Sequence, residues 1–326
     1  MTASRLLMAL REVVVVAAEN SVSQKEVRMM RTIGKVCASL VLACLLGACG
    51  SSDPVTPERF ATVDALVEKV SANLSVSGMR LVADIDHARL GAEAGSPMPP
   101  ARVMIFSDPE LESRLMALHP LVGVDLPLRV LSYEAVEEGA AKVIVNNFDY
   151  IVSRYGLDPS LTRALRSSYD NALQTALAAI PENTRASFET DVMDPDGLIT
   201  ITSPYDFDET LERVNAAIDS QGDTMQFGVF DYQASAQELG IELPPATLIL
   251  FGGPGPGGKA MAGAPTLGLD AFCQKFLVWQ DAEGTTHLSY NDLLALAERQ
   301  QVGKSIPLRV INFRLNKVFG EALERD

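Results

Sequence analysis

The chain contains two copies of one sequence pattern, and this duplication constrains its fold more than any other feature. Matching residues recur in the same order at a spacing of 145 residues: Gly95, Pro99, Pro100, Phe106, Pro109, Met116, Pro120, Asp125 and Arg154 match Gly240, Pro244, Pro245, Phe251, Pro254, Met261, Pro265, Asp270 and Arg299. Two further pairs, Arg129/Lys275 and Tyr133/Trp279, are 146 residues apart. So many ordered matches indicate that one structural unit occurs twice in tandem.

The second copy shows the order of strands and helices most clearly. Alternating β-branched residues predict a strand over 198–202, and an apolar stripe predicts a helix over 206–220 that stops before Gly222. Further strands are predicted over 225–230, 247–251, 275–279 and 285–290, with shorter helices over 233–239 and from Asn291 or Asp292 to Arg299. This order predicts an α+β fold, in which an antiparallel sheet carries its helices on one face.

Apolar segments also join and follow the two copies, which span 55–157 and 198–300. Residues 158–197 should form a helical linker, because Pro159 suits the first helical position and apolar residues recur at helical spacing as far as Ile180. Residues 301–326 should dock as a strand or helix. Each copy, at about 100 residues, can build a core but leaves an apolar face to cover. We therefore expect an intramolecular pseudo-dimer with pseudo-twofold symmetry.

The first part of the sequence predicts export and a lipid anchor. Arg31 and Lys35 precede a short apolar run over 36–46, which is too short to span a bilayer that needs about 20 helical residues. Cys49 directly follows Leu-Gly-Ala and resembles the cysteine of the bacterial lipoprotein box. We expect 29–48 to be a signal peptide, and Cys49 to carry a palmitate-containing lipid that attaches the chain to the membrane.

Two further expectations concern this region. Residues 1–28 are interpreted as an upstream extension from a mis-assigned start, and the alternative is a short membrane-associated helix over 6–18. Because Gly50 rather than Asp follows the cysteine, we expect the outer membrane, facing the periplasm, and not retention at the inner membrane.

Charge and cysteine usage exclude several classes of function. Lysine and arginine number 27 against 42 acidic residues, a net charge of −15, so nucleic-acid binding is not expected. Of the four cysteines, only Cys273 would remain free after processing and lipidation, and no pair has the spacing of a zinc site. We therefore expect no disulfide, no metal and no cofactor.

Asp84, Asp86 and His87 form the best cluster for chemistry. Strand alternation places the two carboxylates on one face with the histidine at the strand end, and a carboxylate can orient an imidazole for base catalysis or metal binding. The alternative is a helix-capping Asp86 beside a packed His87.

The glycine-rich stretch 253–259 has the G-x-x-x-x-G-K spacing of a phosphate-binding loop. However, Ala260 stands where Ser or Thr would hold Mg²⁺, and Gly263, Pro265 and Gly268 interrupt any following helix. We interpret this stretch as a flexible loop.

At these motifs the chain resembles the bacterial "domain of unknown function 302" family. Copy one supplies the motifs at 85–88, 99–100, 124–127 and 154–157, and copy two those at 203–210, 243–245, 251–254, 278–281 and 289–292. Neither copy is complete: Tyr232 replaces the family histidine that His87 keeps, and Gln280 replaces an acid. The resemblance implies a TATA-binding-protein-like β-α-β-β-β-β-α unit that often dimerises, and it implies no settled activity.

These observations favour a non-catalytic envelope module that binds a small ligand or another envelope protein. The candidate ligand-binding residues come from both copies: Asp86, His87, Asp125, Tyr290, Asn291 and Asp292. The alternative is an enzyme or metal-dependent protein that uses the Asp84/Asp86/His87 cluster. The two hypotheses are separated by whether His87 lies beside Asp125 and Asp292 in one pocket.

Overall fold

The structure is a computed structural model that describes residues 56–189 and 197–325. The predicted extension 1–28, the signal peptide 29–48 and the lipidation site Cys49 lie outside the described residues.

The first repeat alternates helices with four main strands. In chain order its elements are α3 (Pro57–Ser77), β1 (Arg80–Asp86), α4 (His87–Glu93), β2 (Ala101–Ser107), α5 (Pro109–Leu118), the 3₁₀ turn η1 (Pro120–Val124), β3 (Leu128–Ala135), β4 (Ala140–Ile144), α6 (Phe148–Tyr155) and α7 (Pro159–Ala176). The short η2 (Glu182–Thr184) and β5 (Arg185–Ala186) follow.

The elements of the second repeat are, in chain order, β6 (Leu198–Thr202), α8 (Phe207–Asp219), β7 (Met225–Asp231), α9 (Tyr232–Gln237), β8 (Ala246–Gly252), α10 (Pro254–Met261), η4 (Pro265–Gly268), β9 (Gln274–Gln280), β10 (Thr286–Asn291), α11 (Leu293–Arg299) and α12 (Ile306–Ala322). The elements from α8 to α12 follow the same order as those from α3 to α7, and a strand, β6, precedes them. Strands β1 and β7, and likewise β2 and β8, begin and end 145 residues apart. The predicted tandem α+β repeat is therefore confirmed.

Each repeat forms a five-stranded sheet, with strand orders β1-β2-β3-β4-β5 and β6-β10-β9-β8-β7. Within each sheet neighbouring strands are antiparallel, with one difference at the outer edge. Strand β6 precedes its helix and runs antiparallel to β10, whereas β5 follows α7 and runs parallel to β4. The edge position beside the β3–β4 hairpin is therefore occupied by a strand from the C-terminal end of the first repeat. The matching position beside the β9–β10 hairpin is occupied by a strand from the N-terminal end of the second repeat.

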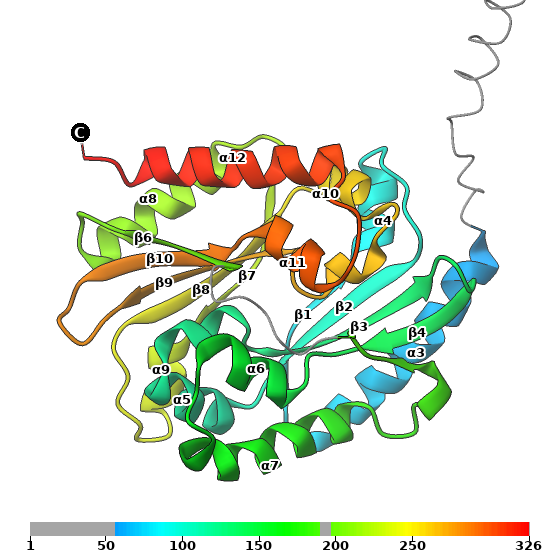
Figure 1. Cartoon of the computed structure of the whole chain (residues 1–326), viewed down its shortest axis with the longest axis horizontal. Helices are drawn as coiled ribbons and strands as arrows, with labels where there is room; N and C mark the ends of the chain where they lie inside the picture. Colours follow the sequence, from blue (N-terminus) through cyan, green and yellow to red (C-terminus); the bar gives the residue numbers. More distant parts are fainter. Residues whose placement is uncertain (1–55, 190–196, 326) are drawn as a thin grey trace, which may run out of the picture. The chain divides into compact units, whose positions relative to one another are not determined.

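Helices cover the sheets and also connect the repeats (Figure 1). Helix α3 packs on the first sheet and α8 on the second, and α12 packs on α8 and α10. Between repeats, α4 contacts α10 and α5 contacts α9, while η1 packs on β9 and η4 on β3. Each of these contacts is matched by one with the two repeats exchanged, which is the pattern of a two-fold interface.

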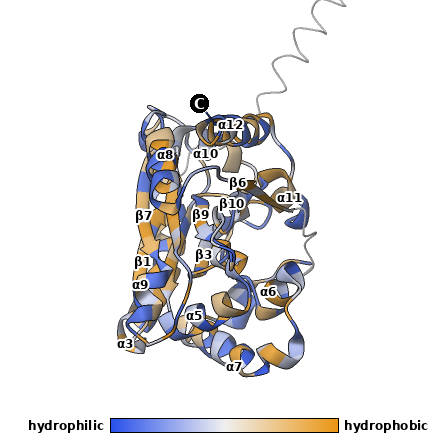
Figure 2. Ribbon diagram, turned by 90° about the vertical axis from the view of Figure 1, so that its left-hand side faces the viewer, coloured by the Kyte–Doolittle hydropathy of each residue, from blue (hydrophilic) through white to orange (hydrophobic). Residues whose placement is uncertain are grey.

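The sheets and the inner sides of the helices form the core. Every residue of β8 is buried, and so are most residues of β2, β3 and β9. Figure 2 shows hydrophobic residues along the strands and hydrophilic residues on the outer sides of the helices. In the part of the chain that the structure describes, no helix combines the length and apolar character needed to cross a membrane.

The interpretation of 253–259 as a flexible loop is wrong, because these residues begin helix α10. Gly253 is its N-cap and Pro254 its first residue. A Cβ at Gly258 would collide with the carbonyl oxygen of Ser96 and lie 3.3 Å from the Cα of Gly91 in α4. The glycines therefore allow two helices from different repeats to approach closely, and this packing outweighs their low helix propensity.

Candidate functional site

The Asp84/Asp86/His87 cluster does not form one site. Asp84 accepts hydrogen bonds of 2.6 Å from both Nε and Nη2 of Arg102. Asp86 caps α4 by accepting from the backbone N–H of Arg89 at 2.9 Å, and it also pairs with the Arg89 guanidinium. Both carboxylates line an open polar hollow of about 800 Å³ beside α3, and His87 is not among its lining residues.

His87 instead links the two repeats. Its Nε2 lies 3.2 Å from the carbonyl oxygen of Gly268 in η4, and burial lowers the pKa of the imidazole to about 4. Tyr232, its counterpart in the second repeat, donates to the carbonyl oxygen of Gly123 at 2.9 Å. Gly123 and Gly268 are also 145 residues apart. Histidine and tyrosine thus make the same contact between repeats, which supports a structural role for His87.

Two of the remaining candidates also make structural contacts. Asp292 caps α11 by accepting from the backbone N–H of Leu294 at 2.7 Å. The hydroxyl of Tyr290 donates to Asn316 Oδ1 of α12 at 3.0 Å. Neither contact brings these side chains to His87.

Asp125 and Asn291, from different repeats, are brought together by Arg154. Nη1 of Arg154 donates to Asp125 Oδ2 and its Nη2 donates to Asn291 Oδ1, both at 2.5 Å. The hydroxyl of Tyr155 donates to the same oxygen of Asp125 at 2.8 Å. Two of the candidate residues, one from each copy, therefore meet around an arginine that the sequence did not single out as a site residue.

A second carboxylate continues this network. Asp270 accepts from Arg129 at 3.1 Å, from Asn146 at 2.8 Å and from Arg299 at 3.3 Å. Arg129 also donates to Asp125 at 3.1 Å, so one guanidinium bridges both carboxylates.

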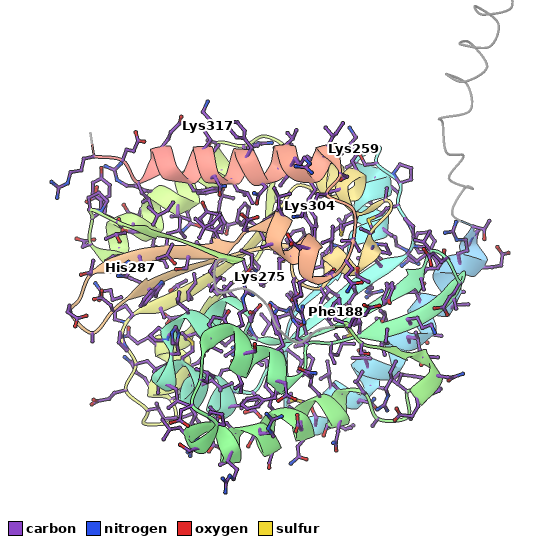
Figure 3. The ribbon with its side chains drawn as sticks, viewed as in Figure 1. Phe188, Lys259, Lys275, His287, Lys304 and Lys317 are labelled. Carbon is purple, nitrogen blue, oxygen red and sulfur yellow. The ribbon has the colours of Figure 1, made fainter. Side chains whose placement is uncertain are left out.

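We call the six charged residues of this network the central charge cluster: Asp125, Arg129, Arg154, Asp270, Lys275 and Arg299. They form three repeat-related pairs, Asp125/Asp270, Arg129/Lys275 and Arg154/Arg299. The sequence therefore contained a signal for the whole cluster, since every member belongs to a matching pair. Figure 3 labels Lys275 in the interior of the molecule, between the two sheets.

The central charge cluster is buried. The side chains of Asp125, Asp270 and Arg154 are 0% exposed, and those of Arg299 and Arg129 are 2% and 4% exposed. Burial alone would raise the pKa of Asp125, but Arg154 and then Arg129 hold it well below its ordinary value. Burial, with help from Arg129, lowers the pKa of Lys275 to about 7.

Positive charge exceeds negative charge in this cluster. Three arginines face two carboxylates, which leaves one positive charge, and Lys275 adds a second when it is protonated. Several buried N–H groups also have no hydrogen-bond partner within 56–189 and 197–325, namely Nη1 of Arg129, Nε of Arg154, Nε and Nη2 of Arg299, and Nδ2 of Asn291. They outnumber the unpartnered acceptors of the residues bonded to Asp270, which are Oδ1 of Asn146 and Oε1 of Gln300. A buried donor normally has a partner, so this arrangement is suited to an anion.

Other chemistry finds little support in the described residues. No group of three or more His, Cys, Asp or Glu side chains within them is arranged to hold a metal ion. Cys273 is buried, and burial raises the pKa of its thiol to about 11, so it is not an activated nucleophile.

A model of the family "Domain of unknown function DUF302" matches the chain twice, over 55–180 and 199–318. These ranges include α7 and most of α12, which the sequence had set apart as a linker and a tail. A solved structure, the "uncharacterized conserved protein DUF302 from Bacillus stearothermophilus", is 19% identical with a TM-score of 0.33, over 39% of this chain and 95% of that chain.

Among curated proteins, the chain is similar to "Fluoride-specific ion channel FluC 1" of Brucella suis biovar 1 and of Brucella abortus biovar 1. Each is 40% identical over 109 residues, which is 33% of this chain. The match covers 42% and 40% of those two proteins, so the chain spans about two fifths of their length.

Proposed function

We propose that this chain, which belongs to the Domain of unknown function DUF302 family, is a lipid-anchored envelope protein whose two repeats together bind a small anion without transforming it. The observation that carries the proposal is the central charge cluster, where buried positive charge exceeds negative charge and several N–H groups have no partner in the described chain.

The energetics of burial support this reading. An uncompensated charge inside a protein is costly, and a buried donor without an acceptor costs about 1–3 kcal/mol. An anion would remove both penalties at once. It would also lie between the repeats, since Arg154 and Asn146 each bond across the interface. Binding would therefore strengthen the contact between the repeats.

The names of the curated relatives suggest one anion to test first. Those proteins are named as fluoride-specific channels, and fluoride is a small anion that can accept several hydrogen bonds. Because the similarity covers only 33% of this chain, fluoride enters as a probe and not as the assigned ligand.

Thermal unfolding of the full chain in detergent micelles tests anion binding. Fluoride, chloride, formate, acetate and phosphate are compared at constant ionic strength with a buffer whose only anion is bulky HEPES. A ligand at 100 times its Kd should stabilise the folded state by about 2.7 kcal/mol. The matched control is Arg166→Gln, which removes an exposed pair with Asp149. If no anion stabilises the wild type more than HEPES does, the proposal of anion binding is wrong.

The anchor is tested separately. The short apolar run and the Leu-Gly-Ala-Cys49 sequence support lipidation, so the wild type should incorporate labelled palmitate and Cys49→Ser should not. Equal labelling of both proteins would refute the anchor and leave anion binding unaffected.

A further inference from the structure

We infer that the anion is an oxyanion, bound side-on by the guanidinium of Arg299 through its Nε–H and Nη2–H groups. This inference rests on the proposed function, because it specifies the ligand class and the recognising residue of the same cluster.

Arg299 presents a free edge of a buried guanidinium. Its Nη1 donates to Asp270 at 3.3 Å, while Nε and Nη2 have no partner among the residues that the structure describes. These two N–H groups point the same way in the guanidinium plane. They can donate two parallel hydrogen bonds to two oxygens of one group, as in an arginine–carboxylate or arginine–phosphate pair. A halide can accept both hydrogen bonds only at its single centre, so the two N–H groups must converge on it instead of donating in parallel.

Aromatic rings hold this edge in place. The Arg299 guanidinium lies 3.7 Å from the ring centroid of Tyr150 and 4.3 Å from that of Phe188. Stacking on both rings stabilises the cation and restricts rotation of its plane, while the bond to Asp270 fixes its position. A pre-oriented donor pair loses little entropy when a ligand binds. Phe188, labelled in Figure 3, approaches the cluster from the segment after β5.

Arg154, the counterpart of Arg299, is occupied. Its Nη1 bonds to Asp125 and to the hydroxyl of Tyr150, and its Nη2 bonds to Asn291 and to the carbonyl oxygen of Gly197. Only its Nε lacks a partner within the described ranges. The geometry therefore assigns one bidentate position in the cluster, at Arg299.

The cluster is tightly packed around the ligand position. The narrow cavity lined by Asp270, Lys275 and Asn291 does not reach Arg299 and has no room for a sphere the size of a water molecule. Binding at Arg299 therefore requires neighbouring side chains to move apart, so the probes increase in size from formate to acetate and inorganic phosphate, with fluoride and chloride as the halide comparison.

The test compares Arg299→Lys with the wild type by calorimetric titration of each probe, using the full chain. Lysine keeps the charge but cannot donate side-on, so oxyanion affinity should fall at least tenfold while any halide affinity changes less than twofold. Phe188→Leu, which alters a partly exposed ring and should not prevent folding, should weaken oxyanion binding severalfold. Circular dichroism verifies that both variants are folded.

The outcomes separate the inference from the proposed function. If halides bind as well as oxyanions and Arg299→Lys binds all probes like the wild type, the inference fails and anion binding stands. If no probe binds the wild type, the proposed function itself fails. Asp191, Asp194 and Asp196 lie outside the described residues, and their joint replacement by asparagine controls for a carboxylate from the chain itself. If the triple variant binds oxyanions as well as the wild type does, the inference is supported. If the triple variant binds oxyanions and the wild type does not, the inference is overturned.

Discussion

Replacing Glu112 by glutamine should stabilise the protein at neutral pH. Glu112 lies on α5, close to the contact with α9 of the other repeat, and is 1% exposed. Its Oε2 is 2.8 Å from the hydroxyl of Ser107, and its Oε1 accepts from the backbone N–H of Asp108 at 3.1 Å. Burial, only partly opposed by these hydrogen bonds, raises the pKa of the carboxyl to about 8.

The magnitude follows from proton linkage. Above about pH 4.5 the unfolded chain releases this proton while the folded chain keeps it, so stability falls as pH rises, by about 1.4 kcal/mol per pH unit. The loss reaches about 3 kcal/mol at pH 7 and ends near the folded-state pKa of about 8. Glutamine should keep both hydrogen bonds of the protonated acid, because its amide nitrogen can donate to Ser107 and its oxygen can accept from Asp108. The substitution removes the ionisable group and therefore the loss of stability that its raised pKa causes as pH rises.

Urea unfolding at several pH values between 4 and 8 measures this effect. The stability gain of Glu112→Gln should be near zero at pH 4 and about 3 kcal/mol at pH 7. Glu110→Gln, on the exposed face of the same helix, should change stability by less than about 0.5 kcal/mol throughout. A gain for Glu112→Gln that does not vary with pH would show that the carboxyl is ionised in the folded protein and that the reasoning is wrong.

Three further predictions concern the contacts between repeats. Gly258→Ala should destabilise the protein by about 2 kcal/mol in urea unfolding, because the new Cβ would collide with Ser96. The control Gly263→Ala has open space around it and should not destabilise the protein. Equal effects of the two substitutions would contradict the close approach of α4 and α10. Because burial lowers the pKa of His87 to about 4, the protein should lose about 3 kcal/mol of stability as pH falls from 6.5 to 4. His87→Gln should lose this pH dependence. An unchanged pH profile in the variant would mean that another group causes it. Anion affinity should be severalfold higher at pH 6 than at pH 8, because Lys275 titrates near pH 7, and calorimetry of Lys275→Gln should show no such difference.

Much of the fold could be predicted from sequence because the duplicated pattern doubles the information for each element. The strand over 198–202 and the helix that Asp206 caps appear at the predicted positions, since alternation and capping are local properties. Helix α10 could not be predicted in this way, because its glycines disfavour a helix locally and are explained only by the packing on Gly91.

The site was predictable in part for a related reason. Asp125 and Asn291 were both named from sequence as candidate ligand-binding residues, and Arg154 joins them. The ion pair of Arg129 with Asp270 spans 141 residues, and no local pattern encodes such a contact. Asp86 left two possibilities open, since a carboxylate beside a histidine suggested chemistry and a helix cap was the alternative; the structure shows the cap.

The duplication explains why the central charge cluster can be asymmetric. A dimer of identical repeats would place the same side chains on both sides of its axis and would offer two equal positions. In one continuous chain each copy can change alone: Tyr150, whose ring stacks on Arg299, corresponds to Ala295, and Tyr155, which bonds to Asp125, corresponds to Gln300. These two differences add the Tyr150 and Tyr155 hydroxyls to the network around Arg154 and Asp125. Nη2 of Arg154 also bonds to Asn291 and to the carbonyl oxygen of Gly197, whereas Nη2 of Arg299 has no partner in the described chain. Divergence of the copies thus makes the buried network asymmetric, and the proposed anion position lies on the side where Arg299 keeps unpartnered N–H groups.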